Sequence, residues 1–158
     1  MRNVLFVSGC THHCKGCFQP QTWDFQNGDP WDEQIKTEFL EACEPSFIEG
    51  ITFLGGEPME EVNQKELLPL AKEFKRRFPE KNIWCYTGYT LETDLLDKNG
   101  KAHFDTTDEL LSLIDVLVDG EFVLELKDVT LQFRGSSNQR ILEKNKEGKW
   151  IPWSKRMR

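Results

Sequence analysis

Three of the chain's five cysteines fall within one short stretch, CTHHCKGCFQP, which runs from residue 10 to residue 20. Cys10, Cys14 and Cys17 have the spacing C-x3-C-x2-C. In a reducing compartment, clustered cysteines of this kind are more often metal ligands or catalytic groups than disulfide partners. The spacing therefore predicts that Cys10, Cys14 and Cys17 hold a metal or a metal cluster.

A structural zinc site is the simpler of two interpretations, with His12 or His13 as the fourth ligand. Structural zinc sites usually take their four ligands as two spaced pairs from separate segments, and this sequence has no second pair. Cys43 stands alone after a predicted helix, and Cys85 lies within the apolar run IWCY. Both are expected to be free and buried. The zinc site remains an alternative.

An iron–sulfur cluster is the second interpretation, and three thiolates on one loop favour it. A cubane [4Fe–4S] cluster takes one ligand at each iron, so three cysteines leave one iron open. An open iron can bind a substrate directly, which a closed four-ligand site cannot. His12 and His13 are expected to be exposed neighbours of the cluster without an acid–base role.

The segments that must position this loop are apolar runs and amphipathic stretches that alternate along the chain. Short runs rich in β-branched and aromatic residues predict buried strands at residues 4–7, 51–54, 83–86 and 116–118. Segments between these runs have helical periodicity, which predicts helices at residues 32–42, 63–78 and 107–114.

This alternation predicts an α/β fold with a largely parallel sheet, because each gap between strands holds a helix, as βαβ units require. A complete eight-stranded barrel needs about 250 residues. A chain of 158 residues therefore fits a partial, incomplete TIM-like β/α barrel, and we expect a single domain over residues 1–158. After Gly120 the pattern weakens, and residues 129–133 (VTLQF) alternate like one further strand.

Polar, glycine-bearing loops follow all four predicted strands. SGCTHHCKGC follows the first strand, GGEP the second, YTGY the third and VDGEF the fourth. In parallel α/β folds, the loops at the carboxyl ends of the strands carry the chemistry. We therefore expect the four loops to face one shared site.

Charge and composition limit the possible partners. The formal net charge is -7, and the only basic cluster is SKRMR at the end of the sequence, so no nucleic-acid partner is expected. The first ten residues have neither the length of a signal peptide nor that of a membrane helix. We expect a cytoplasmic protein without a membrane partner.

The C-x3-C-x2-C loop and the later GGEP resemble the radical S-adenosylmethionine superfamily. Within it, GCTHHCKGCFQPQTWDF, LGGEP, YTGY, VDGEF and FRGSSNQR together are similar to the activating proteins of anaerobic ribonucleoside-triphosphate reductases. The similarity runs over about residues 4–141. One position departs from the superfamily, in which an aromatic residue commonly precedes the third cysteine. Here that position is Gly16 and the aromatic residue is Phe18, and glycine is usual there in the activating proteins.

The resemblance implies two cofactors, a [4Fe–4S] cluster and S-adenosyl-L-methionine. Cys10, Cys14 and Cys17 would ligate the cluster, and its open iron would chelate the amino and carboxylate groups of S-adenosylmethionine. The residues implied to contact the cofactor lie in the loops after the four strands: Gly16, Cys17, Phe18, Gly55, Gly56, Glu57, Tyr86, Thr87 and Asp119.

Several of these residues have an alternative interpretation, in which they have a structural role and do not contact the cofactor. Glu57 would lie near the cofactor's ammonium group, and a side chain at Gly56 would project toward the cofactor's amino-acid end. GGEP alone is also typical of an ordinary turn after a strand. Tyr86 would orient the cofactor or belong to the core, and Asp119 would bind a ribose hydroxyl or cap the following segment.

The activity implied by the resemblance is that of an oxidoreductase that activates a glycyl-radical enzyme. It would cleave S-adenosylmethionine reductively and generate a glycyl radical on the large subunit of anaerobic ribonucleoside-triphosphate reductase. The electron donor would be a flavodoxin or a thiol system, and no catalytic residue beyond the cluster and cofactor ligands is expected. Two alternatives are a radical enzyme with a small heterocyclic substrate and a non-catalytic zinc-binding module. Trp150 and Trp153 are expected to pack on this domain rather than to dock a partner.

Overall fold

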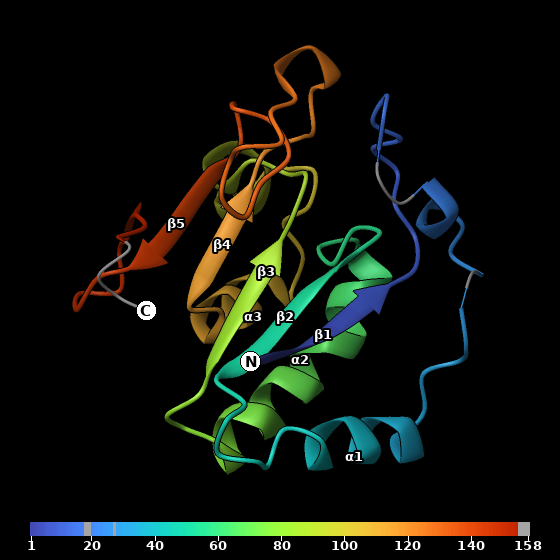
Figure 1. The fold of residues 1–158 in the computed structure, drawn as a ribbon, viewed down its shortest axis with the longest axis vertical. Coiled ribbons are helices and arrows are strands. Elements are labelled where there is room, and N and C mark those ends of the chain that lie inside the picture. Colours follow the sequence, from blue (N-terminus) through green and yellow to red (C-terminus); the bar gives the residue numbers. More distant parts are fainter. Residues whose placement is uncertain (18–19, 27, 155–158) are drawn as a thin grey trace.

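The computed structural model describes residues 1–17, 20–26 and 28–154, and these residues form one six-stranded sheet with the order β1-β2-β3-β4-β5-β6 (Figure 1). The strands are β1 (Arg2–Val7), β2 (Gly50–Gly55), β3 (Asn82–Tyr86), β4 (Val116–Asp119), β5 (Arg140–Lys144) and β6 (Trp150–Pro152). The pairs from β1 to β4 are parallel, whereas β4–β5 and β5–β6 are antiparallel. This open, mostly parallel sheet confirms the predicted α/β fold and is consistent with a partial β/α barrel.

One helix follows each of the first three strands, as the sequence predicts. They are α1 (Glu33–Glu41), α2 (Glu61–Arg77) and α3 (Thr107–Leu113), with shorter helical turns η1 (Pro20–Trp23), η2 (Leu91–Leu96) and η3 (Leu124–Leu126) in the connecting loops. Helix α1 begins where the side chain of Asp32 accepts a hydrogen bond from the amide of Ile35 at 2.8 Å, a typical N-cap. Among the described residues, no helix combines the length and the apolar content that a bilayer span requires.

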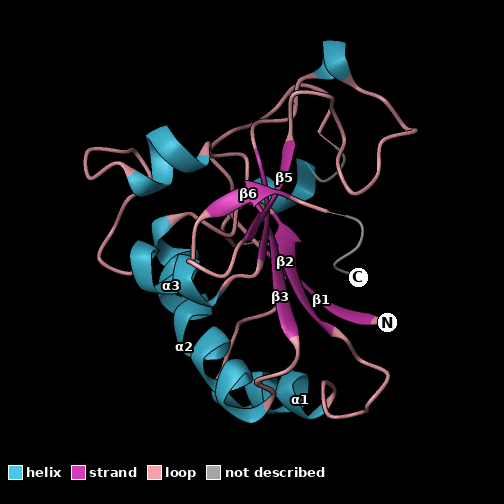
Figure 2. Cartoon of the chain, turned by 90° about the vertical axis from the view of Figure 1, so that its left-hand side faces the viewer, coloured by secondary structure: helices cyan, strands magenta, loops and turns pink. Residues whose placement is uncertain are grey.

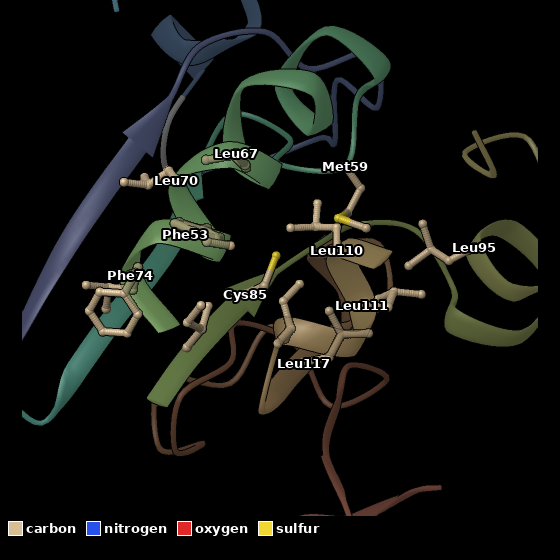
Figure 3. Close-up of a cluster of buried hydrophobic side chains, with 14 of the residues drawn as sticks. Phe53, Met59, Leu67, Leu70, Phe74, Cys85, Leu95, Leu110, Leu111 and Leu117 are labelled. Carbon is tan, nitrogen blue, oxygen red and sulfur yellow. The ribbon is translucent and has the colours of Figure 1, made fainter. Parts of the chain in front are cut away.

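The main hydrophobic core lies between the sheet and helices α2 and α3 (Figure 3). Alternate residues of the central strands point to this side, and Phe53, Cys85 and Leu117 are fully buried there. Phe74 of α2 faces them from the helix layer. Burial of each large apolar side chain contributes about 1.5–3 kcal/mol. Cys43 is likewise fully buried, so both cysteines outside the cluster loop are free core residues, as predicted.

The opposite, inner face of the sheet carries a second and smaller apolar cluster. Figure 2 shows α2 and α3 together on one side of the sheet. On the other side, Val118 and Ile141 are buried, and Tyr86 and Trp153 pack against them. Trp150 packs against the main core instead. Both tryptophans of the carboxyl-terminal segment therefore pack on this domain, as expected.

The expectation of a strand at residues 129–133 is wrong. Oδ1 of Asp128 accepts hydrogen bonds from the amide and the hydroxyl of Thr130, at 2.9 and 2.6 Å, and Val129 is 85% exposed. Such local bonds between side chain and backbone compete with strand pairing. The strands that complete the sheet are β5 and β6, joined by a turn in which Oδ1 of Asn145 accepts from the amides of Glu147 and Lys149.

Candidate functional site

The loops after β1, β2, β3 and β4 surround one pocket of about 490 Å³ at the carboxyl ends of the strands. All three cysteines of the C-x3-C-x2-C loop lie on its wall. The predicted meeting of the four loops is therefore confirmed. Of the residues singled out in the sequence, those on the wall are Cys10, His12, Cys14, Cys17, Gly55, Gly56, Glu57, Tyr86 and Thr87.

The three cysteines are free thiols. Burial raises the pKa of Cys10 to about 11. Burial, together with the negative charge of Glu121, raises the pKa of Cys14 to about 12. Metal ligands must be thiolates, so iron binding has to displace the protons of these two thiols. Loading of the site is therefore expected to release protons.

The arrangement fits a cluster better than a single zinc ion. In the described part of the chain, no group of three or more His, Cys, Asp or Glu side chains is placed to hold one metal ion. The thiolates of a [4Fe–4S] cluster bind different irons, so they do not have to converge on one atom. A zinc site would need a fourth ligand, but His12 is bonded to Glu57 and His13 is stacked on Trp23.

The two histidines of the cysteine loop have different surroundings. His13 is exposed, and its ring lies 4.4 Å from that of Trp23 at an interplanar angle of 9°. The side chain of His12 is only 7% exposed, and its Nε2 lies 2.8 Å from Oε1 of Glu57. Burial by itself would lower the pKa of His12, but the hydrogen bond and charge of Glu57 outweigh burial and raise it. The expectation of an exposed histidine is correct for His13 and wrong for His12.

Glu57 is the centre of a hydrogen-bond network that joins three loops, and it is 1% exposed. Its Oε1 accepts from the amide of Gly88 at 2.7 Å and also contacts His12. Its Oε2 accepts from the hydroxyl of Thr87 at 2.6 Å and from the amide of Met59 at 2.9 Å. Glu57 thus holds the cysteine loop against the loop after β3. Its contact with the ammonium group of a cofactor stays a prediction.

Glu60 provides a second attachment for the cysteine loop. Its Oε1 accepts from the hydroxyl of Thr11 at 2.7 Å and from the hydroxyl of Tyr89 at 2.9 Å. The ring of Tyr89 also meets the ring of His12 edge to face, with centroids 4.4 Å apart. Two carboxylates from one loop therefore fix Thr11 and His12, which lie between the first two cysteine ligands.

We expect Glu57→Gln to lower the free energy of unfolding by about 2–4 kcal/mol, because the amide nitrogen of Gln cannot accept and leaves buried donors unpaired. Glu60→Gln is the matched control. The three donors on Glu60 share Oε1, so the amide oxygen of Gln can keep them, and a loss below about 1 kcal/mol is expected. Chemical denaturation of the full chain measures both values. If the two variants lose the same free energy of unfolding, Glu57 is not the main residue that holds these loops together.

A side chain at Gly56 would collide with backbone, and its expected projection toward the cofactor stays a prediction. A Cβ at this position would lie 2.6 Å from the carbonyl oxygen of Gly9 and 2.8 Å from that of Thr22. Real Cβ atoms do not approach backbone oxygens so closely. Gly56 therefore permits the close approach of the segments on either side of the cysteine loop. A contact between its backbone and a cofactor stays a prediction.

Asp119 does not line the pocket. It is 1% exposed, and its carboxylate forms two hydrogen bonds with the guanidinium of Arg140, at 2.9 and 2.5 Å. Oδ2 also accepts from the amide of Leu91, the first residue of η2, at 2.9 Å. The observed role of Asp119 is to tie β4 to β5 and to η2. Its contact with a ribose hydroxyl stays a prediction.

Of the other residues predicted to contact the cofactor, Tyr86 lines the pocket and Gly16 does not. Gly16 is not on the pocket wall, and its φ of +77° favours glycine. A Cβ there would also lie 2.6 Å from Cδ1 of Leu124. Phe18 lies outside the described residues. Tyr86 lines the pocket, and burial raises its pKa to about 12, so its phenol is neutral at ordinary pH.

Two polar wall residues, Arg134 and Gln139, come from the motif FRGSSNQR, in which the sequence predicts no site residue. Arg134 is the one Lys or Arg on the described wall, and its buried Nε has no hydrogen-bond partner among the described residues. Gln139 fixes the loop, because its Oε1 accepts from the amides of Gly135 and Ser136 at 2.8 and 3.1 Å. The similarity of FRGSSNQR to the activating proteins was the only sequence signal for this part of the wall.

Comparison with known proteins identifies the family. A family model described as a 4Fe-4S single cluster domain matches residues 1–142. The anaerobic ribonucleoside-triphosphate reductase-activating protein of Haemophilus influenzae is 42% identical over 142 residues, which cover 89% of this chain and 86% of that protein. The chain belongs to the reductase-activating protein family. The activating protein of Escherichia coli K12 is 39% identical over 140 residues (87% and 85%), and that of Enterobacteria phage T4 is 38% identical over 149 (94% and 87%).

Membership of the reductase-activating protein family confirms the resemblance drawn from the sequence. The match to a 4Fe-4S single cluster domain also confirms the prediction of an iron–sulfur cluster. The family model ends at residue 142, so most of β5 lies within the match and all of β6 lies beyond it.

Proposed function

We propose that this chain is a radical S-adenosylmethionine activase that generates a glycyl radical on anaerobic ribonucleoside-triphosphate reductase. The observation that carries the proposal is that three free cysteines share one pocket wall with the glycine loop after β2. This occurs in a chain of the reductase-activating protein family. The chemistry supplied by the bound cluster and S-adenosylmethionine is one-electron cleavage of the cofactor and removal of a hydrogen atom from a glycine.

The chain's own residues bind and orient these groups. Cys10, Cys14 and Cys17 would each hold one iron, and the loop that carries them is fixed by Glu57 and Glu60. The guanidinium of Arg134 is available on the wall for the carboxylate of S-adenosylmethionine. No proton transfer by a side chain is needed for this chemistry.

The partner in this proposal is the large subunit of the reductase, with a flavodoxin or a thiol system as electron donor. An open sheet, rather than a closed barrel, leaves a side through which a protein segment can reach the pocket. The free cysteines support a cytoplasmic location, because thiols stay reduced there. A single radical S-adenosylmethionine domain over residues 1–158, without nucleic-acid or membrane partners, completes the proposal.

A label-transfer experiment tests the proposal. The reductase is prepared with its target glycine deuterated at Cα and is incubated anaerobically with the activase, S-adenosylmethionine and a reductant. We expect deuterium in the 5′-deoxyadenosine and a glycyl radical signal on the reductase by electron paramagnetic resonance. A reductase with Ala in place of that glycine is the control and should give neither. Cleavage of the cofactor without label transfer would favour a small-molecule substrate instead.

A further inference from the structure

A second cavity lies on the inner face of the sheet. It has a volume of about 600 Å³ and is distinct from the cluster pocket, although Leu54 and Tyr86 line both. Its wall contains residues from neighbouring strands, including Trp84 of β3, Val116 of β4 and Glu143 of β5. The register pairs Trp84 with Val116 and Val116 with Glu143, so these three side chains form one row across the sheet.

Glu143 is unusual in this row because its carboxylate has no partner in the described part of the chain. The residue is 6% exposed, and its cross-strand neighbours are the apolar residues Val116 and Ile151. No hydrogen bond or ion pair involves its side chain in the portion of the chain that the structure describes. Its oxygens are not among the fully buried side-chain atoms without a partner, so the carboxylate is open to the cavity and can meet a cation there.

The other charged residues on the cavity wall already have partners. The guanidinium of Arg2 donates to the hydroxyl of Thr52 and to the carbonyl of Ile51. Asp115 pairs with Lys75, at 2.5 Å. The remaining two are Glu49, which is 3.7 Å from the amino terminus, and Lys144, which donates to the carbonyls of Leu111 and Ser112. The carboxylates on the wall outnumber the cations, and Glu143 is the one left for a ligand.

Aromatic rings form another part of the wall. Trp84, Phe133 and Trp153 contact one another edge to face, with centroids 5.3 to 5.7 Å apart. One cation already uses this surface, since the guanidinium of Arg2 lies 5.5 Å from the centroid of Trp84. The face of an indole ring attracts cations, most strongly when water is excluded.

We propose that this cavity binds an organic cation, a guanidinium or alkylammonium group, with Glu143 as its carboxylate partner and the tryptophan rings as its apolar wall. The site goes beyond the proposed function, because Glu143 and Trp153 lie outside the family match to residues 1–142. The cation comes from a bound partner molecule that presents a guanidinium or alkylammonium group.

The test is binding of Nα-acetyl-arginine amide to the cluster-loaded full chain by calorimetry, with the uncharged citrulline analogue as the matched probe. We expect only the arginine probe to bind, and Glu143→Gln to weaken it at least about tenfold, as loss of a charged hydrogen bond predicts. Glu147→Gln, an identical charge change at an exposed position of the same hairpin, should leave affinity unchanged. The probe should also shift the indole resonances of Trp84 and Trp153 in the unmodified chain, which does not depend on whether the Glu143 variant folds.

A variant with glutamine at Lys155, Arg156 and Arg158 tests whether the chain's own basic residues compete with the probe. If the probe binds this variant and not the unmodified chain, the chain's own basic residues compete for the cavity, and the proposal of a partner's cation is overturned. If an external group is the ligand, the probe binds both. The proposal is overturned if the arginine probe binds neither protein. It is also overturned if the citrulline analogue binds as tightly as the arginine probe, or if the Glu143→Gln variant binds the arginine probe as tightly as the unmodified chain does. None of these outcomes depends on cofactor cleavage, so they leave the proposed function to its own test.

Discussion

Cys10→Ala, Cys14→Ala and Cys17→Ala should each abolish cleavage of S-adenosylmethionine and remove most of the bound iron. Each substitution leaves two thiolates for a cluster that needs three from this chain, and no other cysteine on the described pocket wall can replace the lost one. The measurements are iron and sulfide content after anaerobic reconstitution and the yield of 5′-deoxyadenosine. All three variants should have the same phenotype, because the ligands act as one unit.

Cys43→Ala and Cys85→Ala are the matched controls. Both side chains are 0% exposed and lie in the main core, away from the pocket wall. Their removal should leave iron content unchanged and lower the free energy of unfolding by about 1 kcal/mol, as expected for a small buried deletion. Normal iron content and activity in Cys14→Ala would show that the cysteine loop is not the cluster site. Colourless protein that contains zinc would favour the interaction module instead.

The parts of this site that could be predicted from the sequence are those fixed by strand position. The first four strands are apolar runs, and a parallel sheet brings the loops that follow them to one edge. Strands β2 and β4 are largely buried, but the expectation of a buried strand at residues 4–7 is wrong, because β1 is an edge strand and leaves Val4 43% and Phe6 54% exposed. Cys10, Glu57 and Thr87 are far apart in the sequence, but each comes shortly after a strand. The order of strands and helices along the chain was therefore enough to predict that these three residues lie on one pocket wall.

The parts that could not be predicted depend on contacts between side chains from distant segments. Nothing in the sequence around His12 indicates that Glu57 buries it, while His13, its neighbour, stays exposed. The pairing of Asp119 with Arg140 was not predictable either, because it needs the antiparallel strand β5. β5 follows a stretch of turns rather than a crossover helix, so the βαβ pattern gave no signal for it.

Gly56→Ala should have the second large effect, on cluster loading as well as on stability. The φ of Gly56 does not lie in the left-handed region, so the backbone itself accepts alanine. The added Cβ, however, collides with the carbonyl oxygens of Gly9 and Thr22, which already accept hydrogen bonds from the amides of Glu57 and Gly9, both at 2.7 Å. We expect a loss of about 1–3 kcal/mol in the free energy of unfolding, typical of overpacking.

The same collision explains why cluster loading should fall. Gly9 directly precedes Cys10, and the amide of Cys10 donates to the carbonyl of Trp23, which follows Thr22. Displacement of Gly9 or Thr22 therefore moves the first cluster ligand. Iron per chain after anaerobic reconstitution should be well below that of the unmodified protein, and cleavage of S-adenosylmethionine should fall in proportion to it.

Gly148→Ala is the control that separates collision from the loss of a glycine. Gly148 has a φ of +80°, but a Cβ there would meet nothing within 4 Å. Its substitution should cost about 1–2 kcal/mol of stability from the left-handed backbone and leave iron content unchanged. If Gly56→Ala instead loads iron normally and loses only affinity for S-adenosylmethionine, position 56 faces the cofactor after all. The close approach of Gly9 and Thr22 would then not be what requires glycine at this position.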